Sequence, residues 1–200
     1  MRRLCLAGGG TGGHVTPLLA LAEEWTGQGG EVRFVGAAGK IEERMVPAAG
    51  FPLDVLHGGG RVKGMGTLHG LRSLSGVPAG VREASRHLRM FRPDLVLGAG
   101  GWPSFAAGAA ALLSGIPLVL CEQNSIPGLT NRVLSRGARR VCTSFMLTAS
   151  HLDVLKVVLT GNPVRAAFRS RGPREDGRQL GTLLVLGGSQ GARFLNTEVA

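Results

Sequence analysis

Three glycine-rich segments, each lying between an apolar run and a segment of helical character, constrain the fold of this chain more than any other feature. They are GGGTGGH at residues 8–14, GAGGWPS at 98–104 and GGSQGA at 187–192. Glycine permits positive φ and close backbone approach, and tight strand-to-helix turns need both. The pattern predicts a parallel α/β sheet with these turns gathered at the carboxyl ends of its strands, where ligands bind in such folds.

The same alternation of apolar runs and amphipathic segments continues along the chain. Strands are expected at residues 3–7, 31–35, 52–56, 95–97, 116–120, 140–143, 157–160 and 182–186. Helices are expected at 40–48, 104–113 and 129–134, and another is expected to start near Pro78 and to continue to Phe91. An earlier helix is expected to be capped by Thr16, with Pro17 in its first turn. This rhythm is typical of a Rossmann-like, doubly wound parallel sheet.

A polar segment with Gly and Pro at residues 168–180 separates the last glycine loop from the rest of the chain. We therefore expect one Rossmann-like domain at residues 1–161, a crossover or linker at 162–181, and the first βα unit of a second Rossmann-like domain at 182–200. One strand and part of a helix cannot bury a core. The chain is expected to be the front part of a longer two-domain protein.

Charge and composition limit the ligands that this chain would bind. Lys and Arg number 23 against 13 Asp and Glu, a net charge of +10 that favours anionic partners. Aromatic residues make up 4% and Tyr is absent, which argues against nucleic acid because base stacking needs aromatic side chains. The three Cys and five His residues show no metal-ligand spacing, so no metal site is expected. Phosphate groups and anionic lipid surfaces remain.

The glycine loops match one nucleotide-binding motif and one catalytic motif, each only in part. Gly8, Gly10 and Gly13 fit G-x-G-x-x-G, but the second predicted strand ends without the acidic residue that a nicotinamide site needs. The third loop fits the G-x-S-x-G of α/β-hydrolases, but no His follows it. A nucleotide-binding Rossmann module of another enzyme class stays open as an alternative.

Backbone N–H groups at helix N-termini bind phosphate without any charged side chain. The residues expected to hold a diphosphate in this way are Gly9, Gly10, Gly100, Gly101 and Ser104. His14 follows the first loop at a helix entrance, where the helix dipole favours the neutral imidazole that a general base requires. The alternative is that His14 only caps or orients the loop.

Five segments in order resemble the MurG family, the undecaprenyldiphospho-muramoylpentapeptide β-N-acetylglucosaminyltransferases. They are GGGTGGHVTPLLALAEEW, VLGAGGWPS, EQNSIPGLTNRVL, LTGNPVR and VLGGSQGARFLN. The resemblance implies the GT-B fold, in which an amino domain binds lipid I and a carboxyl domain binds UDP-N-acetylglucosamine (UDP-GlcNAc). It implies an inverting transfer to the 4-OH of the muramoyl sugar that forms lipid II for peptidoglycan, without a metal or other cofactor. It also implies peripheral attachment to the cytoplasmic face of the bacterial inner membrane and contact with other cell-wall synthesis proteins.

The resemblance also assigns site residues. His14 would be the base, and the donor-binding residues would be Thr11, Gly12, Gly13, Asn124, Arg165 and Ser189. The residues themselves leave open that Asn124 makes an Asx turn and that Arg165 is solvated. Cys121 stands where the family usually has His, and we expect it to be a small buried residue. Because most of a second domain is missing, the isolated chain is expected to bind donor poorly and not to turn over.

A basic and apolar segment at residues 61–74, with Arg82, Arg86 and Arg89 on the following helix, is expected to contact an anionic membrane surface. The alternative is a solvated helix face over core leucines.

Overall fold

The computed structural model describes residues 2–58, residues 76–166 and residue 197. Met1–Ala166 form one compact unit. The predicted linker from residue 167 onward and the predicted strand at 182–186 lie outside the described residues, so the domain limits at 161 and 181 stay predictions.

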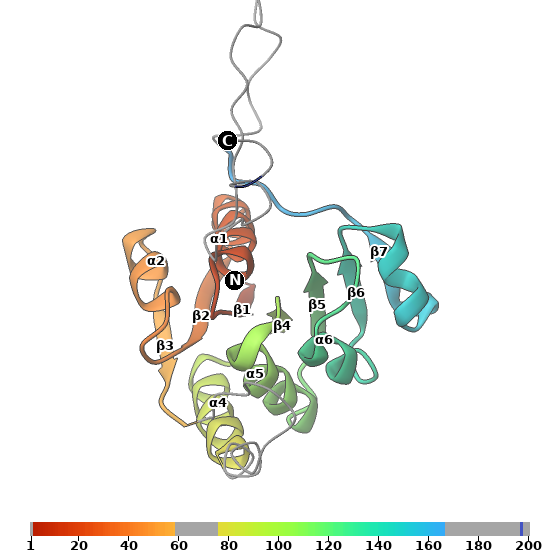
Figure 1. The fold of residues 1–200 in the computed structure, drawn as a ribbon. Coiled ribbons are helices and arrows are strands. Elements are labelled where there is room, and N and C mark those ends of the chain that lie inside the picture. The colour runs from red at the N-terminus through yellow and green to blue at the C-terminus, as the bar shows by residue number, and fades with distance from the viewer. Residues whose placement is uncertain (1, 59–75, 167–196, 198–200) are drawn as a thin grey trace, which may run out of the picture. The chain divides into compact units, whose positions relative to one another are not determined.

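A seven-stranded sheet forms the centre of this unit (Figure 1). Its strands are β1 (Arg3–Ala7), β2 (Glu31–Ala37), β3 (Leu53–Leu56), β4 (Leu95–Gly98), β5 (Leu118–Glu122), β6 (Arg140–Thr143) and β7 (Val157–Leu159). They lie in the order β3-β2-β1-β4-β5-β6-β7, and every neighbouring pair is parallel. The order reverses direction between β1 and β4, which is where doubly wound sheets bind their ligands.

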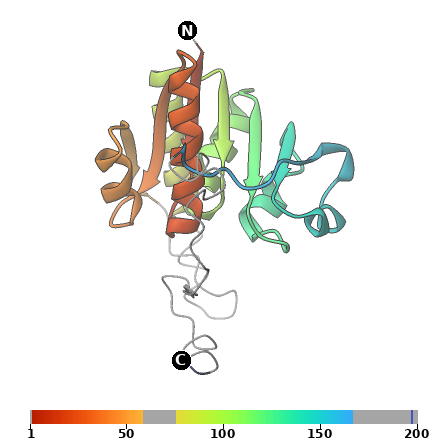
Figure 2. The same cartoon turned by 90° about the horizontal axis from the view of Figure 1, so that it is seen from above.

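Helices cover both faces of the sheet, as Figures 1 and 2 show from two directions. They are α1 (Gly12–Gly27), α2 (Glu42–Ala48), α4 (Val77–Phe91), α5 (Gly101–Leu113) and α6 (Leu129–Leu134), with short 3-10 helices at Met146–His151 and Val154–Lys156. One apolar core joins the sheet to α1 and α2, and a second joins it to α4, α5 and α6. The predicted Rossmann-like, doubly wound sheet is confirmed.

The two cores differ in the size of their side chains. Leu18 and Phe34 are among the large buried residues under α1, whereas α5 contributes Ala106, Ala107, Ala110 and Ala111, all of them fully buried. Small side chains let α5 lie close to the strands beneath it. This close packing holds the second glycine loop, from which α5 starts, firmly against the sheet.

Two helices begin one turn earlier than the sequence predicted. Helix α1 starts at Gly12 with Thr11 as its N-cap, so Thr16 and Pro17 lie inside the helix rather than at its start. Helix α5 starts at Gly101 rather than Ser104. Glycine has a low helix propensity, but tertiary packing of the loops overrides it here. His14 therefore lies in the first turn of α1.

Among the helices of the described ranges, none has the length and apolar character needed to cross a membrane.

Candidate functional site

The first two glycine loops follow neighbouring strands and touch each other. β1 pairs with β4, and the Ala99 N–H donates to the Ala7 carbonyl at 2.9 Å just beyond the pairing. A Cβ atom added to Gly101 would lie 2.6 Å from the Gly9 carbonyl oxygen, so the second loop needs glycine to approach the first this closely. The two loops thus form one surface at the point where the strand order reverses, as predicted. The third loop lies outside the described residues.

His14 connects the two loops. Its Nδ1 lies 2.9 Å from the Gly9 carbonyl oxygen, with the Thr11 hydroxyl more distant at 3.5 Å. A carbonyl oxygen only accepts hydrogen bonds, so this contact assigns the proton of the neutral ring to Nδ1. Nε2 is then the basic nitrogen, and it faces Gly100, where an added Cβ atom would lie 3.1 Å away. The imidazole thereby presents an unprotonated nitrogen to the surface between the loops.

Three helices begin at this surface without a side-chain cap. Their N-cap residues are Thr11 for α1, Gly100 for α5 and Gly128 for α6, and none of these donates or accepts a capping side-chain hydrogen bond. Gly100 has a φ of 99°, a conformation that glycine adopts without strain. Uncapped first turns leave N–H groups that bind anions, and the helix dipoles add partial positive charge. This arrangement suits a ligand with more than one phosphate.

A buried carboxylate lies beneath the first loop. Glu42, which is 1% exposed, starts α2. Its Oε2 accepts the Gly10 N–H at 3.0 Å, and its Oε1 accepts the Ala37 N–H at 3.1 Å. A Cβ atom on Gly9 would collide with this carboxylate, and one on Gly36 would lie 2.6 Å from its Cγ. Two glycines are thus required to make room for Glu42, and the Gly10 N–H is already used within the protein.

A second buried carboxylate organises the loop after β5. Glu122, which is 2% exposed, accepts four hydrogen bonds at 2.9 to 3.0 Å. The donors are the Asn124 N–H and side-chain amide, the Gly128 N–H and the Asn131 side-chain amide. These contacts fix the start of α6. From this helix the Thr130 hydroxyl donates to the Gly101 carbonyl at 3.3 Å, which connects α6 to the second glycine loop.

The other predicted site residues are distributed unevenly around this surface. Thr11, Gly12 and Gly13 form the start of α1 beside His14, with Thr11 and Gly13 exposed. The Asn124 side chain is exposed, and its amide nitrogen donates to Glu122. Arg165 is exposed close to the end of the described chain. Ser189 lies outside the described residues.

Ser104 occupies a different position from the one predicted. It lies within α5, is fully buried, and contacts the place where a Cβ of Gly98 would stand. Its hydroxyl has no hydrogen-bond partner in the structure and faces the sheet rather than the open surface.

The prediction that Cys121 is buried is confirmed, and the residue has a sulfur neighbour. Cys121 and Cys142 are paired in the register of β5 and β6. A hydrogen bond from Cys121 and one from the Thr160 hydroxyl lower the pKa of Cys142 to about 7, although partial burial opposes the shift. The same bond to Cys142, together with burial, raises the pKa of Cys121 well above its usual value.

Sequence reasoning assigned no role to Glu42, Glu122 or Thr130. The position of Glu122 gave a signal, because an acidic residue at the end of an apolar strand must find hydrogen-bond donors when it is buried. Glu42 gave none, since an acidic residue in the first turn of a helix is ordinary on a solvated surface. Its partners come from loops that are distant in the sequence.

Residues 4–143 match the N-terminal domain of glycosyltransferase family 28. The chain belongs to this family. Within the family it groups with the MurG proteins, as the sequence resemblance implied.

Two curated relatives illustrate the similarity. Both are named UDP-N-acetylglucosamine--N-acetylmuramyl-(pentapeptide) pyrophosphoryl-undecaprenol N-acetylglucosamine transferase. The protein of Shewanella amazonensis is 43% identical over 197 residues, which cover 98% of this chain and 53% of that protein. The protein of Magnetococcus marinus is 44% identical over 209 residues, which cover 99% of this chain and 55% of that protein. The chain therefore spans about half the length of the curated relatives it matches.

Solved structures support the family and its fold. MurG of Acinetobacter baumannii superposes with a TM-score of 0.76 at 29% identity, covering 100% of this chain and 54% of that one. UDP-GlcNAc 2-epimerase of Neisseria meningitidis, bound to UDP-GlcNAc, superposes with a TM-score of 0.56 at 19% identity over 82% of this chain and 47% of its own. The second similarity is one of fold alone. The present chain has the α/β architecture of the amino-terminal half of a GT-B enzyme.

Proposed function

We propose that this chain is the acceptor-binding half of an inverting glycosyltransferase that moves N-acetylglucosamine from UDP-GlcNAc to the 4-OH of the muramoyl sugar of lipid I, giving lipid II. The names of the relatives support the substrates. The observation that carries the proposal is His14: its Nδ1 is bound to Gly9, and its Nε2 faces the junction of two glycine loops.

The lipid I diphosphate would bind at the uncapped starts of α1 and α5. Among the residues predicted for the diphosphate, the N–H group of Gly101 at the start of α5 is the donor best placed for it, since the Gly10 N–H is bound to Glu42. The acceptor hydroxyl would lie against Nε2 of His14. Nε2 takes the hydroxyl proton as the oxygen attacks the anomeric carbon, and UDP leaves from the opposite face.

The carboxyl-terminal part of the relatives would supply the rest of the donor site. Thr11, Gly12, Gly13, Asn124, Arg165 and Ser189 would contribute donor contacts from this chain. In the 200-residue chain by itself we expect acceptor binding without turnover, because it spans about half the length of the relatives.

Two measurements test the acceptor half of this proposal. Isothermal titration of the 200-residue chain with a soluble lipid I analogue should give binding that weakens when Gly12 is replaced by Asp, which adds negative charge at the start of α1 where an added Cβ meets no atom within 4 Å. Equal binding of NADH and the lipid I analogue would contradict the proposal and favour another nucleotide-binding class.

The base role needs a two-domain enzyme. Joining this chain to the carboxyl-terminal half of the Shewanella amazonensis relative should give an active transferase, and His14→Ala should lower its kcat by about 100-fold or more. If His14→Ala has the kcat of the parent enzyme, His14 is not the general base.

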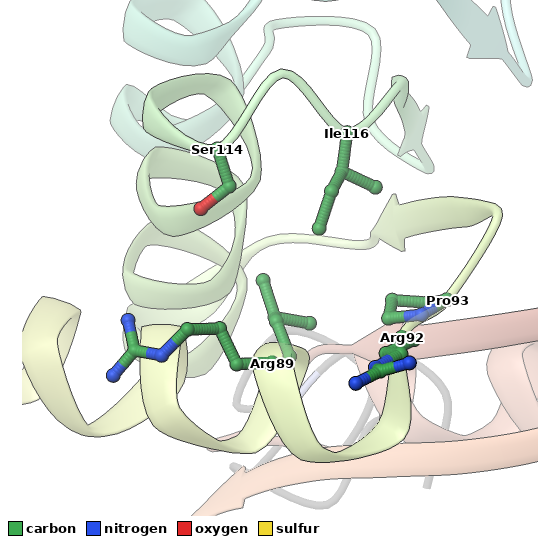
Figure 3. A pocket seen from close by; sticks show the side chains of 6 residues that line it. Arg89, Arg92, Pro93, Ser114 and Ile116 are labelled. Carbon is green, nitrogen blue, oxygen red and sulfur yellow. The ribbon is translucent and has the colours of Figure 1, made fainter.

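Peripheral membrane contact is part of the proposal. On α4, Arg82, Arg86 and Arg89 are exposed, and Met90 is 74% exposed. Arg89 also lines a hollow of about 440 Å³, together with Leu88, Arg92, Pro93, Ser114 and Ile116 (Figure 3). Each cation would add about 1 kcal/mol near an anionic leaflet. The predicted segment at residues 61–74 lies outside the described residues.

Sedimentation with vesicles tests this contact. The chain should co-sediment with phosphatidylglycerol vesicles at low salt and not with phosphatidylcholine vesicles. Equal binding to both lipids would argue against a charge-driven contact.

A further inference from the structure

We propose that Glu42 is a positioning residue that acts on His14 through the single peptide group between Gly9 and Gly10. The inference rests on the proposed function for its catalytic consequence, but its structural part stands on contacts of the described residues alone.

The two contacts of this peptide group lie on its opposite sides. The N–H of Gly10 donates to Oε2 of Glu42 at 3.0 Å, and the C=O of Gly9 accepts from Nδ1 of His14 at 2.9 Å. The N–H and C=O of one trans peptide point in opposite directions within one plane. The carboxylate, the peptide and the imidazole therefore form a continuous chain of hydrogen bonds.

This chain of hydrogen bonds has a defined polarity. A carboxylate bound to the peptide N–H polarises the peptide and increases the negative charge on the Gly9 oxygen, because hydrogen bonds in series strengthen one another. A more negative carbonyl oxygen holds the proton on Nδ1 more firmly. It also stabilises the positive imidazolium that forms when Nε2 accepts a proton, which is the part a buried Asp plays directly in serine proteases.

Glu42 is buried and anchored by hydrogen bonds, without an ion-pair partner among the described residues. Among residues 2–58 and 76–166, the ion pairs of the structure do not include Glu42, so its charge is not compensated by a cation. It is 1% exposed, which reduces screening by water. Its second oxygen is fixed by the Ala37 N–H at the end of β2. The carboxylate is thus anchored to the sheet and directed at the loop.

The experiment measures the ring tautomer of His14 by NMR in the 200-residue chain labelled with ¹⁵N-histidine, so it does not depend on substrate or activity. His14→Gln identifies the His14 signals by their loss. In the parent chain the neutral ring should carry its proton mainly on Nδ1, the reverse of the preference of free histidine. In Glu42→Gln the population should move toward Nε2–H. Glu43→Gln, on the exposed neighbour that accepts from the Gly39 N–H, is the control and should leave the tautomer unchanged.

Three results would overturn the inference. One is a parent chain with the proton mainly on Nε2, which requires no variant and applies even if Glu42→Gln fails to fold. Another is a folded Glu42→Gln chain with the parent tautomer. The third is a Gly10 amide in the parent chain that exchanges as fast as an exposed loop amide, since that would exclude its bond to Glu42.

The catalytic consequence is read separately in the two-domain enzyme. Glu42→Gln should lower kcat by about 10- to 100-fold with little change in the KM for lipid I, and Glu42→Asp should recover part of the loss because it keeps the charge. If Glu42→Gln moves the His14 proton toward Nε2 as expected but leaves kcat unchanged, the proposed base role of His14 is contradicted. The chain of hydrogen bonds from Glu42 to His14 is then still supported. If Glu42→Gln lowers kcat/KM only by raising the KM, the proposal that Glu42 assists catalysis through His14 is contradicted.

Discussion

The β1–β2 side of the sheet and the β5–β6 side each bury one glutamate at the carboxyl edge, and the two carboxylates hold different kinds of partner. Glu42 accepts two backbone N–H groups and lies in space provided by two glycines. Glu122 accepts four hydrogen bonds, two of them from asparagine side chains. The first carboxylate sets the position of a loop that carries the proposed base. The second builds the loop that starts α6. A buried carboxylate thus positions the loop beside the proposed base on one side and the start of a helix on the other.

The largest effect is expected on the β5–β6 side. Glu122→Ala removes the acceptor of four buried or part-buried hydrogen bonds and should reduce the free energy of unfolding by about 3 to 5 kcal/mol. Urea denaturation followed by circular dichroism measures the change. Glu23→Ala, on the exposed surface of α1, is the control and should change it by less than about 0.5 kcal/mol. Similar midpoints for the two variants would show that Glu122 has no structural role.

A smaller effect is expected on the β1–β2 side. Gly9→Ala places a Cβ against the Glu42 carboxylate and should cost about 2 kcal/mol of unfolding free energy. In a Glu42→Ala background the same change should cost at least about 1 kcal/mol less, because the obstructing side chain is gone. Gly12→Ala has open space around its Cβ and lies in a helix, so it should be neutral or slightly stabilising. If the unfolding free energies lost in the two single variants simply add in the double variant, the cost of Gly9→Ala does not come from its contact with Glu42.

The smallest effect concerns reactivity rather than stability, and it contrasts the cysteines of the two sides. The pKa of Cys142 is lowered to about 7, whereas burial and the nearby Asp54 charge raise the pKa of Cys5, in β1, to about 12. Thiolate is the reactive form and its fraction grows as the pH rises through the pKa. Alkylation of Cys142 by iodoacetamide should therefore increase through about pH 7, and Cys5 should remain unmodified in the folded chain. Peptide mass mapping measures both rates.

Cys121→Ala sharpens this last comparison, because it removes the thiol that donates to Cys142. Alkylation of Cys142 at pH 7 should then slow. An unchanged rate would assign the reactivity of Cys142 to exposure alone.

The sequence predicted the sheet well because buried parallel strands show as short apolar runs, and the runs at β1, β4 and β6 are found where they were expected. It placed the starts of α1 and α5 too late because Thr16 and Ser104 resemble helix caps locally, whereas packing between loops distant in the sequence decides the outcome. His14 was recognised from its place after a glycine loop. Its tautomer was beyond prediction because it depends on the direction of one peptide group.

The glycines of the first loop show the same limit. Sequence reasoning assigned Gly9 and Gly10 to a phosphate, but in the structure one accommodates Glu42 and the other donates to it. Residues 9 and 42 are distant in the sequence, so their contact is visible only in the folded structure.

The bare helix starts at this edge carry a thermodynamic consequence. A side-chain cap stabilises a helix by about 1 kcal/mol, and both α1 and α5 lack one. An anion bound to these amides would cap both helices at once, so anion binding would also make this edge of the sheet more rigid.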